Sequence, residues 1–278
     1  MFRNQYDGDI TTWSPKGRIH QVEYALEAVK HGSACVGVKS GRVTVLAALK
    51  RAASTLAEPQ RKVFGIASHM GIAVSGLCAD ARSLVRLMRA QCLDHAFVFD
   101  AAQPSERLVE FVANKSQVHT QKYGRRPYGV GLLVAAYDAD TGAHLFETQP
   151  DGNYFEYKAY AIGARSQSAK TYLEKHVSEF AAASRDQLIN HALLALRDTV
   201  ASKDEQGLTT RNTTIAFVGE GIPFTVWEGE QLKALLDNLE GGTGGKKPGD
   251  DDDDADNAAA ASAAPAAPPK DSTPGELA

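Results

Sequence analysis

The chain has 278 residues, of which 43% are hydrophobic and 23% are charged, as in an ordinary water-soluble globular protein. Its net charge of −4 gives no electrostatic reason to expect nucleic-acid binding. The longest apolar run, Val130–Tyr137, is far shorter than the roughly 20 residues that span a bilayer, and no apolar signal segment follows Met1. We therefore expect neither a nucleic acid nor a membrane as a partner.

The predicted elements begin after a polar N-terminal segment. Apolar residues recur at helical spacing from Ile19 to Val29, after Ser14-Pro15 and before Gly32, which predicts a helix. Two hairpin-like pairs of strands and two helices should follow. The predicted strands are Ala34–Val38, Arg42–Leu49, Val63–Ala67 and Ile72–Ser75, and the predicted helices are Ala79–His95, with an inner face that includes Met88 and Cys92, and a segment from Pro104 that carries Leu108, Phe111 and Val112.

The second half repeats this alternation of hairpins and helices. The predicted strands are Gly129–Tyr137, His144–Thr148, Tyr154–Ile162, Thr213–Val218 and Pro223–Trp227, and the predicted helices are Ser168–Ala182, Ser184–Val200 and Glu230–Leu239. Ser184 and Gln187 have the spacing of a capping box. Because the strands come as hairpins and not in βαβ units, we expect an α+β sandwich of antiparallel sheets with helices outside.

The acidic charge is concentrated at the end of the chain. Residues 241–278 contain three lysines, seven aspartates and one glutamate, whereas residues 1–240 carry a net charge of +1. The last 38 residues include one leucine and no aromatic residue, so they lack the apolar surface that offsets chain entropy on folding. We predict one domain over 1–240 and a disordered acidic Ala/Pro-rich tail over 241–278.

The three cysteines, Cys35, Cys78 and Cys92, are too few and too widely spaced for a disulfide framework or a CxxC metal site. Each has apolar neighbours, which indicates reduced, buried thiols. Such thiols are typical of a reducing compartment, so we expect the cytoplasm and nucleus.

Several partial motifs favour ordinary structural explanations. His20 and Glu23 begin a zinc-helix pattern, but Tyr24 replaces the second histidine and leaves too few ligands. The glycine- and lysine-rich residues 242–247 lack the first Gly and the Ser/Thr of a phosphate loop. The basic loop with Lys122, Arg125 and Arg126 has little aromatic surface for stacking bases. We expect no metal and no cofactor.

Gly32-Ser33 allows a catalytic alternative. N-terminal nucleophile hydrolases cleave after Gly to free a Ser, Thr or Cys that opens a strand, and its new amino group then acts as base. Ser33 precedes the first predicted strand, but Leu49 stands where a supporting acid would be needed. The segment before Gly32 also has the pattern of a helix and not of a disposable propeptide.

The N-terminal third carries a specific pattern that resembles the alpha-type subunits of the 20S proteasome. The pattern is Tyr6-Asp7, then Ser14-Pro15-Lys16-Gly17-Arg18 and Gln21-Val22-Glu23-Tyr24-Ala25. Further matches are Gly76–Arg82, Tyr123–Gly129 and Ile162–Ala169, and together they cover nearly all of residues 1–240. Met1–Asp7 and Gly163–Ala169 are similar to one eukaryotic subgroup, type 1.

This resemblance implies a four-layer αββα sandwich and a non-catalytic place in a seven-membered alpha ring stacked on a ring of beta-type subunits. It also implies axial gating by the N-terminal segment, residues 1–17, and docking of regulatory caps during ubiquitin-dependent and other intracellular protein degradation. By motif position, Tyr6, Asp7, Pro15 and Tyr24 match the gate-stabilising cluster, whereas Lys62, Gly32 and Gly76 match the cap-docking pocket.

Structural explanations remain open for these residues. Tyr24 could only pack on its neighbour, Lys62 could be a solvated lysine beside Arg61, and Gly32 and Gly76 could only end a helix and a strand. One departure matters as well. Gly8 stands where the family usually has Arg after Tyr-Asp, so this segment should contribute less to gate closure. A free-standing scaffold is a third possibility, besides an active hydrolase and a ring subunit.

Overall fold

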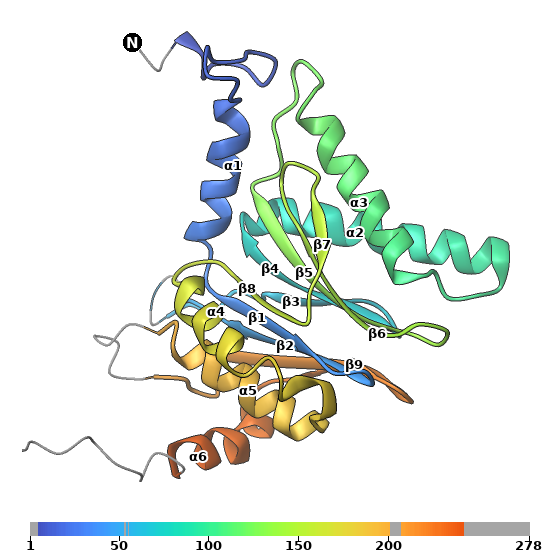
Figure 1. Ribbon diagram of the computed structural model, residues 1–278, viewed down its shortest axis with the longest axis vertical. Coiled ribbons are helices and arrows are strands. Elements are labelled where there is room, and N and C mark those ends of the chain that lie inside the picture. Colours follow the sequence, from blue (N-terminus) through green and yellow to red (C-terminus); the bar gives the residue numbers. More distant parts are fainter. Residues whose placement is uncertain (1–4, 53, 55, 201–206, 242–278) are drawn as a thin grey trace, which may run out of the picture. The chain divides into compact units, whose positions relative to one another are not determined.

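The structure is a computed structural model that describes residues 5–52, 54, 56–200 and 207–241, all within one compact unit. Within these residues, ten strands form two antiparallel five-stranded sheets (Figure 1). The predicted tail lies outside the described residues, except for Gly241.

The first sheet has the strand order β10–β9–β2–β1–β8. Its strands are β1 (Cys35–Lys39), β2 (Val43–Leu49), β8 (Ala159–Ile162), β9 (Thr213–Gly219) and β10 (Ile222–Trp227). All seven residues of β2 and of β9 are buried, as expected for central strands covered on both faces.

The second sheet has the strand order β3–β4–β5–β6–β7. Its strands are β3 (Val63–Ala67), β4 (Met70–Gly76), β5 (Val130–Asp138), β6 (Gly142–Thr148) and β7 (Tyr154–Glu156). In the central β4–β5 pair, Gly76 lies opposite Val130. The start of one family-like segment, Gly76–Arg82, therefore lies next to the end of another, Tyr123–Gly129.

Helices cover the outer face of each sheet (Figure 1). The second sheet is covered by α2 (Cys78–Phe99) and α3 (Ser105–His119), and the first by α4 (Ser166–Lys175) and α5 (Arg185–Arg197). The remaining helices are α1 (His20–His31), which contacts β4 and β5, and α6 (Lys233–Gly241), which follows β10.

Three apolar clusters hold these layers together. One joins α4 and α5 to the first sheet through residues such as Leu193 and Val45, and a second joins α2 and α3 to the second sheet through residues such as Leu84 and Leu132. The third lies between the sheets and includes Leu46 and Leu133. This is the predicted four-layer αββα sandwich, and burial of these faces supplies its main favourable free energy.

The predicted strand Tyr154–Ile162 is wrong as a single element. Its first part, β7, pairs with β6, and its second part, β8, pairs with β1 in the other sheet. At the crossing, Tyr157 N donates to Leu145 O at 2.8 Å, and Lys39 N donates to Lys158 O at 2.9 Å. The chain therefore passes from the second sheet to the first at two consecutive residues, Tyr157 and Lys158.

The helical predictions also need one correction. The predicted helix Ser168–Ala182 ends at Lys175, and a separate 3₁₀ turn, Phe180–Ala182, buries Phe180 beside α5. The predicted helix that carries Leu108, Phe111 and Val112 is α3, in which Leu108 and Val112 are buried and Phe111 is 37% exposed. The capping box of Ser184 and Gln187 at the start of α5 is confirmed.

Candidate functional site

The N-terminal segment is tied to α1 through Asp7. The Tyr24 hydroxyl donates to Asp7 Oδ2 at 3.1 Å, and the Gln21 side-chain amide donates to the backbone carbonyl of Asp7. Gln21 and Tyr24 are three residues apart on one helix, so both reach the same stretch of chain. Gln21 was not among the predicted cluster residues, although its spacing from Tyr24 could have indicated it.

The other two predicted cluster residues are placed more loosely. Tyr6 is half-buried, and Pro15 is exposed in the turn where Gly17 N donates to Ser14 O at 2.9 Å. The structure therefore brings Asp7 and Tyr24 together, and the roles predicted for all four residues stay predictions.

Gly32 and Gly76 meet where α1 ends. A Cβ on Gly32 would collide with the Gly76 backbone nitrogen and would lie 2.9 Å from the Ser75 carbonyl carbon. Gly76 itself has φ +112°, a conformation that residues with a side chain rarely adopt, and its Cβ would collide with Gly129 O. Both glycines therefore have a structural reason, whatever further role they take.

A third glycine, Gly163, packs against the same place from the end of β8 in the first sheet. Ala164 N donates to Gly32 O at 2.7 Å, and Ser75 Oγ lies 2.9 Å from Val29 O and 3.2 Å from Ser33 O. A Cβ on Gly163 would lie 2.6 Å from Ser33 O. We call Gly32, Ser75, Gly76 and Gly163 the glycine junction. It joins α1, β4 and the β8–α4 turn.

Lys62 lies beside this junction and is buried. Its residue is only 4% exposed, and its carbonyl accepts a hydrogen bond from Val74 N at 3.0 Å, two residues before Gly76. Burial raises the pKa of the neighbouring Cys35 thiol to about 11, and the charge of Lys62 acts in the opposite direction. The alternative of a solvated lysine is therefore wrong.

The Lys62 ammonium has no hydrogen-bond or ion-pair partner in the part of the chain that the structure describes. A buried charge is unfavourable unless it is paired and hydrogen-bonded. By contrast, Lys50, whose side chain is also almost buried, lies 3.2 Å from Glu228 Oε1. The Lys62 side chain is thus largely buried next to a backbone-rich junction, but its ammonium nitrogen is not among the fully buried atoms that lack a partner, so it is accessible to an incoming anion.

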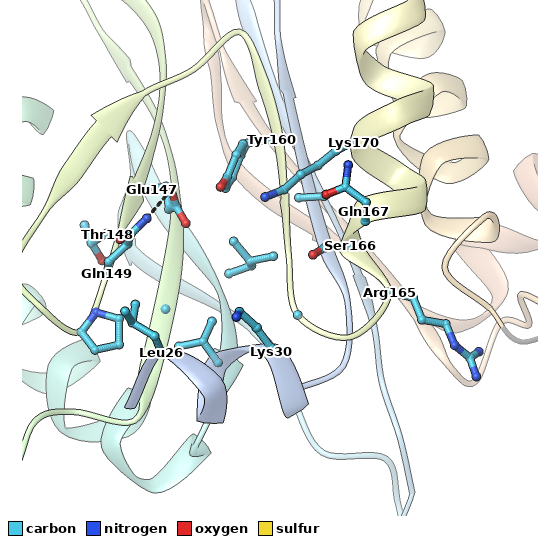
Figure 2. A pocket seen from close by; sticks show the side chains of 16 residues that line it. Leu26, Lys30, Glu147, Thr148, Gln149, Tyr160, Arg165, Ser166, Gln167 and Lys170 are labelled. Carbon is cyan, nitrogen blue, oxygen red and sulfur yellow. Dashed lines mark hydrogen bonds between the residues drawn. The ribbon is translucent and has the colours of Figure 1, made fainter. Parts of the chain in front are cut away.

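A cavity of about 440 Å³ adjoins the junction on the side of Gly163. It lies between α1, β6, β8 and the start of α4, and Figure 2 shows Glu147, Tyr160 and Lys170 facing one another across it. Lys170 Nζ is 3.9 Å from the centre of the Tyr160 ring. The cavity wall therefore combines a carboxyl, an amine and an aromatic face.

Burial shifts the acid–base behaviour of this cavity. Glu147 is 6% exposed, and its burial raises the pKa of its carboxyl, although Gln149 Nε2 donates to it at 3.3 Å. Burial lowers the pKa of the Lys170 amine, and the charge of Glu147 partly offsets this. Both shifts come from lost hydration, so the two charges face each other in a poorly solvated space.

Ser33 shows no support for nucleophilic chemistry. It is buried within the continuous chain from α1 to β1, and its carbonyl is occupied by the glycine junction. Leu49, in the place of a supporting acid, is also buried in the apolar cluster between the first sheet and α5. A search of the described residues finds no group of three or more His, Cys, Asp or Glu that could hold a metal ion.

One apolar surface is left uncovered at the end of α2. Four large apolar side chains, Leu93, Phe97, Val98 and Phe99, are more than half exposed, and Phe97 is 90% exposed. We call these four residues the α2 end patch. Exposed apolar side chains that gather in one short segment are typical of a protein-contact surface. Of the described helices, none is long and apolar enough to cross a bilayer.

Comparison with known families finds two matching models. The model for proteasome subunits matches residues 29–218, and the model for the N-terminal signature of the A-type proteasome subunits matches residues 6–28. The second match contains the Asp7–Tyr24 pair, and the first contains the glycine junction and Lys62.

Curated relatives agree over almost their whole length. The chain is 54% identical over 240 residues to the alpha type-1 proteasome subunit of Dictyostelium discoideum, covering 86% of this chain and 96% of the relative. It is 48% identical over 239 residues to the alpha type-1 proteasome subunit of Caenorhabditis elegans (86% and 91% covered). It is 51% identical to the probable alpha type-6 proteasome subunit of Schizosaccharomyces pombe over 239 residues (86% and 87% covered).

Proposed function

Because the chain belongs to the alpha-type proteasome subunits, the non-catalytic ring subunits of the 20S core particle, we propose that Lys62 receives the carboxylate of a regulatory cap. As a member of this family the chain assembles with other proteasome subunits. Its own part in proteolysis is structural, and an active hydrolase processed at Gly32-Ser33 is not favoured. Cap docking and gating are our proposals.

The observation that carries the docking proposal is the Lys62 ammonium, which ends a largely buried side chain and has no carboxylate partner among the described residues. A terminal carboxylate beside it would replace the hydration that Lys62 loses on folding. Gly32 and Gly76 would take part indirectly, because their close packing, which a side chain would prevent, sets the shape of the junction beside Lys62. Such a tail would bring α1, β4 and the start of β3 into contact with the cap.

The test compares Lys62→Met with wild type in the assembled particle. Methionine keeps most of the packing volume and removes the charge, so assembly and basal peptidase activity should persist. We expect cap affinity to fall severalfold and not to vanish, because other pockets of the ring share the load. The matched control is Arg61→Gln, which removes the neighbouring exposed cation. Equal cap affinity in wild type and Lys62→Met would remove Lys62 from the docking site.

We further propose that the Asp7–Tyr24 pair holds the N-terminal segment in the path that closes the axial pore. The 3.1 Å hydrogen bond and the Gln21 contact support a fixed course at Asp7. Gly8 follows directly, and a Cβ there would meet nothing within 4 Å. Tyr24→Phe should therefore raise basal peptide hydrolysis by the particle only modestly, about twofold or less, since the bond to the Asp7 carboxylate is exposed to water and other subunits share the gate. Unchanged hydrolysis, with the exposed Tyr123→Phe as control, would contradict this role.

We propose the cytoplasm and nucleus as the location. The described cysteines are free thiols, and Cys35 and Cys92 are buried with pKa values raised to about 11. Such unreactive thiols are compatible with a reducing compartment. Fractionation of cells that express a tagged chain tests this, and recovery from a secretory compartment would contradict it.

A further inference from the structure

A second charged surface lies on the outer face of α2 and α3. A groove of about 400 Å³ runs there and is lined by Ser83, Arg86, Leu87, Ala90, Lys115, His119, Arg125 and Tyr128. Three of these residues are cations and none is an acid. We call it the cationic groove. Figure 1 shows α2 and α3 side by side over the second sheet.

The three cations of the groove are exposed and unpaired. Among the described residues, the side chains of Arg86, Lys115 and Arg125 make no ion pair and no hydrogen bond, whereas some cations elsewhere pair with carboxylates. Lys30 lies 2.6 Å from Glu27, for example, and Arg126 lies 2.7 Å from Asp80. The residues that line the groove therefore bring together three positive charges and supply no counter-charge.

The positive charges on α2 repel one another and so destabilise this helix. Arg82 and Arg86 are four residues apart, and Arg86 and Arg89 are three apart, so like charges face one another along one helix. Such pairs destabilise a helix by a few tenths of a kcal/mol. Arg89 is held by Gly65 O at 2.6 and 2.9 Å, but Arg86 has no such compensation. A ligand that brings negative charge would relieve the repulsion.

A separate ion pair keeps Arg125 at the groove. The Asp80 carboxylate accepts from both terminal nitrogens of Arg126, at 2.7 and 2.8 Å, and from Gly129 N at 2.9 Å. This neutralises the acid in the first turn of α2 and anchors the loop that carries Arg125. Asp80 therefore cannot serve as a counter-charge for the groove.

The floor of the groove is partly apolar and aromatic. The rings of His119 and Tyr128 stack with their centres 4.5 Å apart, and Leu87 lies beside them. The groove can thus accept apolar side chains between charged ones. This combination of cations above an aromatic floor indicates a peptide and not a bare ion.

We propose that the cationic groove binds an acidic peptide segment of a partner protein. Arginine forks pair with carboxylates in two-point contacts, and several carboxylates on one chain could meet all three cations. A compact phosphate is commonly cradled by free backbone N–H groups, but the groove is lined by the sides of two helices, whose N–H groups are already bonded. Three cations are also too few to track a nucleic-acid backbone with high affinity.

The charge of the groove favours a partner that binds transiently. The centres of permanent subunit interfaces are depleted of charged residues. The α2 end patch, in the last two turns of the same helix, has the apolar character of such an interface, and the groove does not. Binding through exposed charges is weakened by salt, so occupancy should be sensitive to ionic strength.

The test uses a fluorescent peptide that alternates pairs of glutamates with single leucines, and it measures anisotropy with the full-length chain. Replacing Arg86, Lys115 and Arg125 together by Gln should lower affinity about tenfold at low salt, because each exposed charge pair contributes a factor of about two to three. The melting temperature should not fall, since the replaced side chains are exposed and make no ion pair or hydrogen bond among the described residues. A matched control replaces three other exposed cations, Arg107, Lys175 and Lys233, by Gln and should bind the peptide as wild type does.

Four outcomes would overturn the proposal. They are unchanged affinity in the groove variant, an equal loss in the control variant, and displacement of the peptide by inorganic phosphate or single-stranded DNA at lower concentration than by unlabelled peptide. The fourth uses the assembled particle and a photoreactive version of the peptide. Crosslinks to α2 and α3 in the particle would support a transient docking site, whereas binding by the free chain that disappears in the particle would make the groove a subunit interface.

Discussion

At the scale of single residues, the glycine junction is the tightest constraint in the molecule. Gly32→Ala should destabilise the chain by about 2 kcal/mol or more, because the new Cβ meets backbone atoms that cannot rotate away. Gly41→Ala is the control, since a Cβ there meets nothing within 4 Å. Thermal unfolding of both variants measures the difference. A Gly32→Ala variant as stable as Gly41→Ala would contradict the close packing of α1 against β4.

The Asp80–Arg126 pair should give the chain a distinct dependence on pH. Hydrogen bonds from Arg126 hold the pKa of the Asp80 carboxyl below its usual value. Because the folded-state pKa is depressed, this stabilisation is fully present above the unfolded pKa of about 3.9 and is lost as pH falls through the folded pKa.

Asp80→Asn should therefore cost about 1–2 kcal/mol at neutral pH, discounted for the exposure of Arg126, and the difference from wild type should shrink below about pH 4. Asp94→Asn removes an exposed acid from the same helix and serves as control. Denaturant unfolding at several pH values gives the comparison. A stability difference that is independent of pH would remove the charge of Asp80 as the cause.

The sequence predicted the chemistry of the site residues better than their surroundings. Lys62 next to Arg61 has the pattern of an exposed basic pair, and its burial depends on strands and helices that fold around it. Gly32, Gly76 and Gly163 are separated by 44 and 87 residues, so no local pattern could reveal that they touch. The resemblance identified two of these glycines, but their steric role appears only in the folded chain.

At the scale of secondary-structure elements, local signals were most reliable where capping and periodicity agree. The capping box of α5 is formed in both directions, since Gln187 N donates to Ser184 Oγ and Ser184 N donates to Gln187 Oε1. Six buried residues of α5 then pack on the first sheet. The start of this helix was therefore predictable from four residues.

Ser184→Ala should lower stability by about 1 kcal/mol, because it removes a cap from a helix that packs on the central strands β1 and β2. Ser168→Ala, at an exposed position within α4, should have almost no effect, since alanine favours helix there. Thermal melts of the two variants provide the measurement. Equal melting temperatures would mean that the cap contributes little.

The elements that were predicted wrongly are those fixed by distant partners. The apolar pattern runs through Tyr154–Ile162 without a break, but β7 pairs with β6 and β8 pairs with β1, more than 120 residues earlier. Similarly, α4 ends at Lys175 because the chain must turn to bury Phe180. Tertiary pairing overrides local pattern at both places.

At the scale of the whole molecule, residues 242–278 lie outside the described residues, and their predicted disorder stays a prediction. Deleting them should leave particle assembly and melting temperature unchanged, because they offer almost no apolar surface to bury. Analytical ultracentrifugation and thermal melts of the shortened chain provide the check. A large loss in either would mean that the acidic tail docks on a neighbouring subunit.

The central claim is that this chain is a non-catalytic subunit of a proteasome ring. Native mass spectrometry of the complex purified through a tag on this chain tests it most directly. The account predicts a stacked-ring particle of many subunits that releases this chain at about its full mass of 29.8 kDa, apart from changes at its termini, with the first 32 residues retained. Recovery of a free monomer, or of a chain that begins at Ser33, would contradict it.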